Sequence, residues 1–161
     1  MKMRIEYLAD YPDFVGTLGQ WHQQQWAYLK PGEHVDKWIV ELRSFCGRRQ
    51  IPSAFVAVLD DQPVGSALLI AQDMDSQNDL SPWLASVFVA PECRGQQIGS
   101  SLLVRVAEEA RTLAIPRLYL FTEDARSFYE RLGWQVLKRT TYFDRNLVIL
   151  YWDIGPQIGQ G

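Results

Sequence analysis

The sequence predicts an α/β fold in which one central mixed sheet of about seven strands is flanked by about four helices. Strand-like and helical patterns follow one another in the order strand, two helices, three strands, helix, strand, helix, two strands. Residues 82–121 form a strand–helix–strand unit, which predicts a right-handed parallel crossover, whereas the first strands are antiparallel. We expect a single domain over residues 1–155 and a flexible Gly/Gln-rich tail over 156–161.

The first half of the chain supplies a strand, two helices and a hairpin. Asp10 is a candidate N-cap with Pro12 near the first turn, and Pro31-Gly32 ends the helix that follows. Apolar residues at helical spacing then predict a second helix. The expected elements are a strand over 4–8, a helix that ends before 31, a helix over 33–46, and a hairpin of strands 53–59 and 64–70 around Asp60-Asp61-Gln62-Pro63.

The second half begins with a polar loop and continues with the parallel unit. On the helix from 97 to about 113 we expect Arg105 and Glu109 on the outer side, as an i,i+4 ion pair. Gly133 suits a left-handed helix cap. The expected elements are a loop over 71–81, strands 82–89 and 117–121, a short helix that ends at Leu132-Gly133, and closing strands 134–142 and 147–153 around Asp144-Arg145-Asn146.

Composition excludes several classes of function. A net charge of -3 and a pI of about 5.4 argue against nucleic-acid or anionic-membrane binding. No apolar run reaches the roughly 18 residues of a membrane span. The two cysteines make no disulfide framework, so we expect free thiols and a cytoplasmic location. No residues have metal-ligand spacing, so we expect no metal.

The junction between the apolar strand and the long helix is the candidate binding motif. Gly95 and Gly99 lie in the loop and at the helix start. Backbone N–H groups at such a junction lack helical partners and carry the positive end of the helix dipole, so they can hold a phosphate. A glycine pair alone is equally compatible with a plain strand-to-helix turn.

Together with the element order, two segments give the chain a resemblance to the GCN5-related N-acetyltransferase (GNAT) superfamily. Residues 94–99, Arg-Gly-Gln-Gln-Ile-Gly, resemble the acetyl-CoA motif of that family. Residues 125–134, with Ala125, the Phe128-Tyr129 pair and Leu-Gly-Trp, resemble its later signature. Two positions depart from the pattern. Gln97 stands where the motif has its first glycine, and Thr122 where many members carry an Asn that contacts the pantetheine arm.

The resemblance implies acetyl-CoA as the acyl donor and direct transfer of its acetyl group to a primary amine of a small molecule or peptide. It implies Tyr129 as the general acid that protonates the departing thiolate. The cofactor-binding positions that it implies are Phe88, Val89, Arg94, Gly95, Gln96, Gln97, Ile98, Gly99, Ser100, Thr122, Ala125 and Phe128. A catalytically silent acyl-CoA-binding sensor remains the alternative, because no carboxylate occupies the strand that often carries the base in relatives.

The base and the acceptor stay open at this stage. Ser86 is the polar residue nearest the base position, with Glu123, Asp73 or Asp75 as alternatives through water. An aromatic acceptor wall, with Trp21, Tyr28 and Trp83 as its predicted contacts, suits an ammonium or amphipathic amine, although each of these residues is equally compatible with core packing. The two histidines, His22 and His34, are expected to be structural or surface residues. Polyamine, aminoglycoside, amino acid and protein N-terminus all remain possible acceptors, and the chain could be a monomer or a homodimer.

Overall fold

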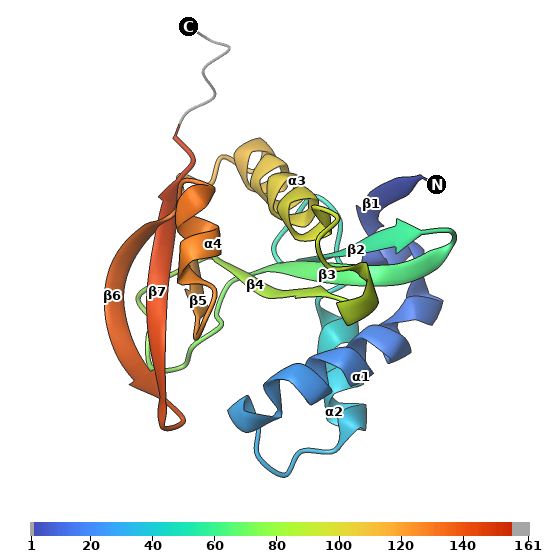
Figure 1. Ribbon diagram of the computed structural model, residues 1–161, viewed down its shortest axis with the longest axis horizontal. Helices are drawn as coiled ribbons and strands as arrows, with labels where there is room; N and C mark the ends of the chain where they lie inside the picture. Colours follow the sequence, from blue (N-terminus) through green and yellow to red (C-terminus); the bar gives the residue numbers. More distant parts are fainter. Residues whose placement is uncertain (1, 156–161) are drawn as a thin grey trace, which may run out of the picture.

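A computed structural model describes residues 2–155, so the expected tail over 156–161 lies outside the described residues. The described chain forms one seven-stranded sheet in the order β1-β2-β3-β4-β5-β7-β6 (Figure 1). The strands are β1 Met3–Tyr7, β2 Ser53–Leu59, β3 Gln62–Ile70, β4 Trp83–Val89, β5 Arg117–Thr122, β6 Gln135–Tyr142 and β7 Arg145–Asp153. The α-helices are α1 Val15–Trp26, α2 Val35–Ser44, α3 Ile98–Thr112 and α4 Arg126–Arg131. The predicted fold class is confirmed.

The sheet is mixed because one neighbouring pair, β4 and β5, runs parallel while the other pairs run antiparallel. The parallel pairing is confined to one register position, Trp83 opposite Tyr119. Beyond that position the two strands separate, and in Figure 1 the strands β1–β4 run across the view while β5–β7 run upright. The two halves of the sheet therefore meet at a split rather than at a continuous ladder.

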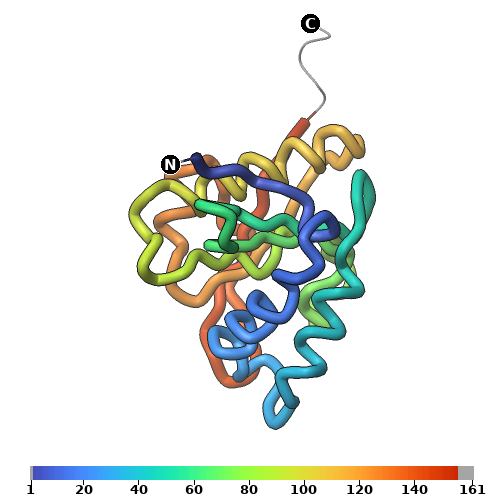
Figure 2. The backbone as a smooth tube through the Cα atoms, turned by 90° about the vertical axis from the view of Figure 1, so that its right-hand side faces the viewer, coloured from blue at the N-terminus to red at the C-terminus, as the bar shows by residue number. Residues whose placement is uncertain are grey.

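Helices cover both faces of the sheet. Figures 1 and 2 place α3 on one side and the pair α1 and α2 on the other. Side chains of β2 alternate between the two resulting cores: Phe55 and Ala57 pack with the α3 side, whereas Ala54, Val56 and Val58 pack with the α1–α2 side. Because both faces are covered, β2 is apolar along nearly all its length.

The approach to α1 differs from the prediction. Asp10 does not cap a helix: it ends a short 3₁₀ turn, Leu8–Asp10, and its carboxylate accepts a hydrogen bond from Arg48. A second 3₁₀ turn, Pro12–Phe14, carries the proline at its start, and α1 begins only at Val15. Proline at the first turn was predicted correctly, but the turn is not α-helical.

The solvent-exposed face of α3 contains fewer residues than predicted, because it excludes Glu109. Glu109 is only 4% exposed, because α3 lies over β1 and the Tyr7 hydroxyl donates to both carboxylate oxygens at 2.9 Å. The predicted pair with Arg105 does form, at 3.0 Å, and the Arg105 guanidinium also lies over the Tyr7 ring. The ion pair that was predicted to be exposed is therefore part of a largely buried network, which holds α3 against the edge strand β1.

Both hairpins turn through two residues with positive φ, as type I′ turns require. The first turn is Asp60-Asp61, with φ of 52° and 62°. The second is Phe143-Asp144, with φ of 49° and 59°, so β7 starts at Arg145 and not two residues later as predicted. Among residues 2–155, no helix combines the length and apolar character needed to cross a bilayer.

Candidate functional site

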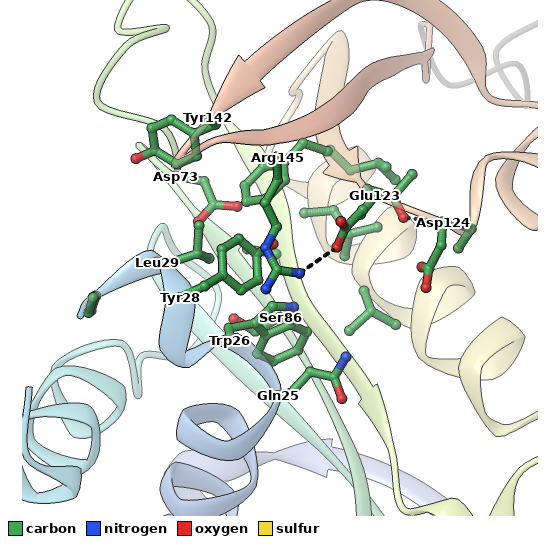
Figure 3. Close-up of a pocket in the computed structure, with 18 of the residues that line it drawn as sticks. Gln25, Trp26, Tyr28, Leu29, Asp73, Ser86, Glu123, Asp124, Tyr142 and Arg145 are labelled. Carbon is green, nitrogen blue, oxygen red and sulfur yellow. Dashed lines mark hydrogen bonds and ion pairs between the residues drawn. The ribbon is translucent and has the colours of Figure 1, made fainter. Parts of the chain in front are cut away.

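A cavity of about 480 Å³ lies where β4 and β5 separate (Figure 3). Residues from both faces of the sheet line it. The C-terminal end of α1 and part of α2 line it from one face of the sheet. The start of α4, with Tyr129, lines it from the other. The cavity therefore lies between the end of α1 with α2 on one side and the segment that holds Ala125 and Tyr129 on the other.

The wall that β4 gives to this cavity is bulged. Ser66 of β3 pairs with Phe88 and Leu68 pairs with Ala85, so two residues of β4, Ser86 and Val87, oppose one residue of β3. Ser86 has a φ of 50°, which few residues other than glycine adopt. A bulge of this kind redirects the strand, and here it coincides with the separation from β5.

The loop between β4 and α3 has the geometry that an anion site requires. Gly95 and Gln97 both have positive φ, 83° and 64°, and Gln97 is the N-cap of α3. The first helical N–H groups, those of Ile98, Gly99 and Ser100, precede the first hydrogen bond of the helix, from Ser101 to Gln97. The positive φ at position 97 explains why a glycine suits this place in the motif.

Arg94 lies at the same loop, but it is already engaged. Its Nε donates to the carbonyl of Val89 at 3.0 Å, and its guanidinium lies 5.9 Å from the Phe88 ring centroid. The Val89 carbonyl is thus not a free acceptor for a bound arm in this structure. The side chain of Arg94 is otherwise exposed.

Three more predicted cofactor positions follow β5. Thr122 and Ala125 line the cavity, and the Thr122 hydroxyl accepts a hydrogen bond from the Ala125 N–H at 3.0 Å. This bond organises the turn into α4. Phe128 packs edge-on against Tyr129, with ring centroids 5.1 Å apart.

Tyr129 lines the cavity and is 8% exposed. Within the described part of the chain its hydroxyl has no hydrogen-bond partner. Burial, together with the charge of Asp124, raises the pKa of Tyr129 to about 12. The phenol consequently remains protonated across the physiological pH range and can donate a proton.

Asp73, in the loop between β3 and β4, also lines the cavity. Its carboxylate is half-buried and has neither a hydrogen bond nor an ion pair within residues 2–155. Burial and the neighbouring charge of Glu41 raise the pKa of Asp73 to about 7, against the opposing effect of Lys30. Of the three carboxylates considered from the sequence, this one is free to exchange a proton near neutral pH.

The other two carboxylates are engaged. Glu123 accepts a hydrogen bond from Arg145 at 3.0 Å (Figure 3). The Arg145 guanidinium lies over the Tyr28 ring, 3.9 Å from its centroid. Asp75 accepts from the Tyr142 hydroxyl at 3.1 Å and does not line the cavity. The Tyr28–Arg145–Glu123 bridge links the end of α1 to the last hairpin.

The three predicted acceptor aromatics are separated by the structure. Tyr28 lines the cavity. Trp21 instead packs on Phe88, 5.5 Å between ring centroids, on the side of Arg94. Trp83 is fully buried, its indole N–H donates to the Leu80 carbonyl, and it is a core residue rather than an acceptor contact. An apolar strand residue that faces the core cannot be distinguished by type from one that faces a cavity.

Sequence reasoning missed a group of residues at the base of the cavity. Lys30 forms an ion pair with Glu41 and lies 4.9 Å from the Trp38 ring centroid. All three line the cavity. Trp38 and Glu41 lie one turn apart on α2. Only the folded structure shows that they lie close to Lys30 and Asp73 and belong to the site.

A comparison with family models finds one match, described as an acetyltransferase (GNAT) domain, over residues 51–136. This span is more than half of the chain. It includes the bulged strand, the loop with Gly95 and Gln97, and Tyr129. A comparison with curated proteins finds no significant match.

Solved structures with the same fold cover nearly the whole chain. An aminoglycoside 6'-N-acetyltransferase complexed with coenzyme A is 20% identical, with a TM-score of 0.76 over 98% of this chain and 99% of its own. The aminoglycoside 6'-N-acetyltransferase from Enterococcus faecium is 19% identical, with a TM-score of 0.73 over 98% and 99%. The protein yncA from Salmonella typhimurium, solved with its cofactor acetyl-CoA, is 17% identical, with a TM-score of 0.72 over 98% and 96%. At these identities the likeness shows the fold.

Proposed function

The chain belongs to the GNAT acetyltransferase family, and on that premise we propose that it transfers the acetyl group of acetyl-CoA directly to a primary amine of a small molecule or peptide. One observation supports this most: a single cavity at the split between β4 and β5 is lined by the unpaired carboxylate of Asp73 and by the protonated phenol of Tyr129. A base and an acid in one cavity are what transfer to an amine requires.

The donor would be held mainly by backbone groups. Its pyrophosphate fits the free N–H groups at the start of α3, and Arg94 of the preceding loop would add a positive charge. Its pantetheine arm fits the split, where β4 has no β5 partner beyond Trp83. Thr122 and Ala125 would line the arm's path. A backbone N–H of the bulged segment would polarise the thioester carbonyl.

The chemistry can be written with the two ionisable groups. Asp73 takes a proton from the acceptor ammonium, and the neutral nitrogen attacks the thioester carbonyl carbon, so that a C–N bond forms. As the carbonyl re-forms, the C–S bond breaks and the thiolate takes the proton of the Tyr129 hydroxyl. The phenolate regains a proton from the nitrogen of the new amide through solvent, and Asp73 releases one proton to water. Ser86 also lines the cavity, and its hydroxyl would serve as a proton relay.

The charges of the cavity favour a cationic acceptor. Four carboxylates line it, Glu41, Asp73, Glu123 and Asp124, against two cations, Lys30 and Arg145. Tyr28 and Trp38 add aromatic faces. The structural likeness to aminoglycoside acetyltransferases makes amino sugars the first acceptors to test, followed by polyamines, amino acids and N-terminal peptides.

The test is release of free coenzyme A thiol from acetyl-CoA in the presence of an amine panel, combined with calorimetric binding of acetyl-CoA. Turnover of a primary amine with mass-confirmed N-acetylation supports the proposal. Tight acetyl-CoA binding without turnover of any amine would overturn it in favour of a silent acyl-CoA sensor. Absence of both binding and turnover would remove the cofactor assignment as well.

A further inference from the structure

The bulge of β4 holds a backbone conformation that its own residues do not favour. Ser86 has a φ of 50°, and a serine gains nothing intrinsic from this region. Such a conformation persists only where the surroundings impose it. The question is which groups impose it here, since the same segment borders the split between β4 and β5.

Two buried side chains, Ser66 and His22, form a chain of hydrogen bonds that ends at the bulge. The Ser66 hydroxyl donates to the Ser86 carbonyl at 3.0 Å, and the Nε2 atom of His22 lies 2.8 Å from the same hydroxyl oxygen. Ser66 is 1% exposed and His22 is 4% exposed, so water does not compete for these bonds. Because the single hydroxyl hydrogen is used on Ser86, His22 must be the donor to Ser66, with its proton on Nε2.

The same helix that carries His22 also holds the next part of β4. Trp21 and Trp26 of α1 both pack against Phe88, with ring centroids 5.5 Å and 6.2 Å away. His22 itself packs edge-on against Trp26, at 5.4 Å. Helix α1 therefore contacts β4 at two points. Hydrogen bonds reach Ser86 through Ser66, and aromatic side chains pack against Phe88.

We infer that His22 and Ser66 are positioning residues for acetyl transfer: they hold the bulged backbone of β4 open toward the thioester. This inference rests on the proposed function, because the held segment is where the acetyl group would lie. If the bond to Ser86 were lost, the segment could relax toward a regular strand and re-pair with β5. The split would then narrow and the backbone N–H that polarises the carbonyl would turn away.

Ser66→Ala tests the inference directly. It should lower kcat about tenfold, while the KM for acetyl-CoA changes less than about threefold. Ser66→Thr keeps the hydroxyl and should recover most of the lost kcat. The matched control is Ser53→Ala, since Ser53 is equally buried and its hydroxyl also donates to a backbone carbonyl, that of Gln50, away from the site. The control should lose stability without loss of kcat.

A second measurement does not depend on turnover. Amide hydrogen exchange of Ser66→Ala should be at least about tenfold faster at Ser86–Phe88 than in the unaltered protein, with no change in β1. His22→Phe should show the same local effect, and His22→Gln, which retains a donor, a smaller one. Unchanged exchange at the bulge, or a kcat loss in Ser53→Ala as large as in Ser66→Ala, would overturn the inference. If the unaltered protein turns over no amine, the proposed function fails while the exchange result still decides whether these residues hold the bulge.

Discussion

The two sides of the cavity are built in different ways. On the proposed donor side, the pyrophosphate site comes from one continuous stretch, β4 through the start of α3, and consists mainly of backbone N–H groups; Thr122 and Ala125 add to the path of the pantetheine arm. On the acceptor side, side chains from α1, α2, the β3–β4 loop and the last hairpin meet around Asp73. A family can keep a local backbone site unchanged while each member rebuilds the dispersed side-chain site. The contrast predicts that donor binding tolerates side-chain changes that abolish catalysis.

Tyr129→Phe should give the largest effect. Loss of the proton donor should lower kcat about a hundredfold or more, while the Kd for acetyl-CoA stays within about twofold. Stopped assays of thiol release and calorimetric titration measure the two quantities. Tyr151→Phe is the control, because Tyr151 bonds to Gln135 at the far side of the sheet. A kcat of Tyr129→Phe equal to that of the control would remove Tyr129 from the mechanism.

Asp73 should impose an acidic limb on the pH profile. Its pKa is raised to about 7, so kcat/KM should fall about tenfold per pH unit below that value as the base becomes protonated. Besides burial, the groups that act on the pKa of this carboxyl are Glu41, which raises it, and Lys30, which lowers it. Asp73→Asn should lower kcat/KM about a hundredfold at pH 8 and abolish the limb.

The same carboxyl has an effect on stability, with a defined sign. Because its folded pKa lies above the unfolded value, the folded state binds the proton more tightly, and the contribution of Asp73 to stability is lost as pH rises from about 4 to about 7. Asp73→Asn should therefore flatten the pH dependence of Tm over this interval. Asp75→Asn, on the same loop but outside the cavity, should leave the activity limb in place; a limb unaffected by Asp73→Asn would assign the base elsewhere.

Gly65→Ala should damage the donor side through packing. A Cβ at this position would lie 2.7 Å from the Phe88 carbonyl oxygen and 3.2 Å from the Cδ1 atom of Leu102. Since the nearest atom is backbone, β3 and β4 must move apart, at about 1–3 kcal/mol of unfolding free energy. Urea unfolding measures the loss. Gly16→Ala, where a Cβ meets nothing within 4 Å, should instead be neutral or stabilising.

Gln97→Gly should have the smallest effect and the opposite sign. Removing the side chain at a φ of 64° relieves left-handed strain, worth up to about 1 kcal/mol, and should raise Tm by a few degrees. The Kd for acetyl-CoA should change less than about threefold, because the site is made by N–H groups rather than by this side chain. A large tightening would show that the native loop is poorly adapted to the cofactor and would weaken the enzyme assignment.

The order of the elements along the chain and the segments proposed for the donor could be predicted from the sequence, because both depend on local patterns. Alternating and helical periodicities placed all seven strands, and each of the two motifs, the one with Gly95 and the one with Tyr129, is a continuous stretch of sequence. The prediction that Asp10 caps a helix was wrong, because its carboxylate instead accepts a hydrogen bond from Arg48, which is distant in sequence. Glu109 was misplaced for the same reason, since β1 covers its face of α3.

The acceptor side could not be derived in the same way. Asp73 was one of three candidate carboxylates, and only the ion pair of Glu123 and the position of Asp75 outside the cavity separate it from the others. The bond from His22 to Ser66 spans 44 residues and leaves no periodic signal. Trp21 and Trp83 were predicted as acceptor contacts from their residue type, but both lie outside the cavity.

The split between β4 and β5 also constrains the order of events in a catalytic cycle. Residues from both faces of the sheet line the cavity, so the two substrates can reach the reacting carbon from opposite sides, and neither has to leave before the other arrives. Initial-rate plots at several fixed acceptor concentrations should therefore intersect rather than run parallel. A single molecule that joins an amine covalently to the coenzyme A sulfur would span both approaches at once, and should inhibit competitively against each substrate.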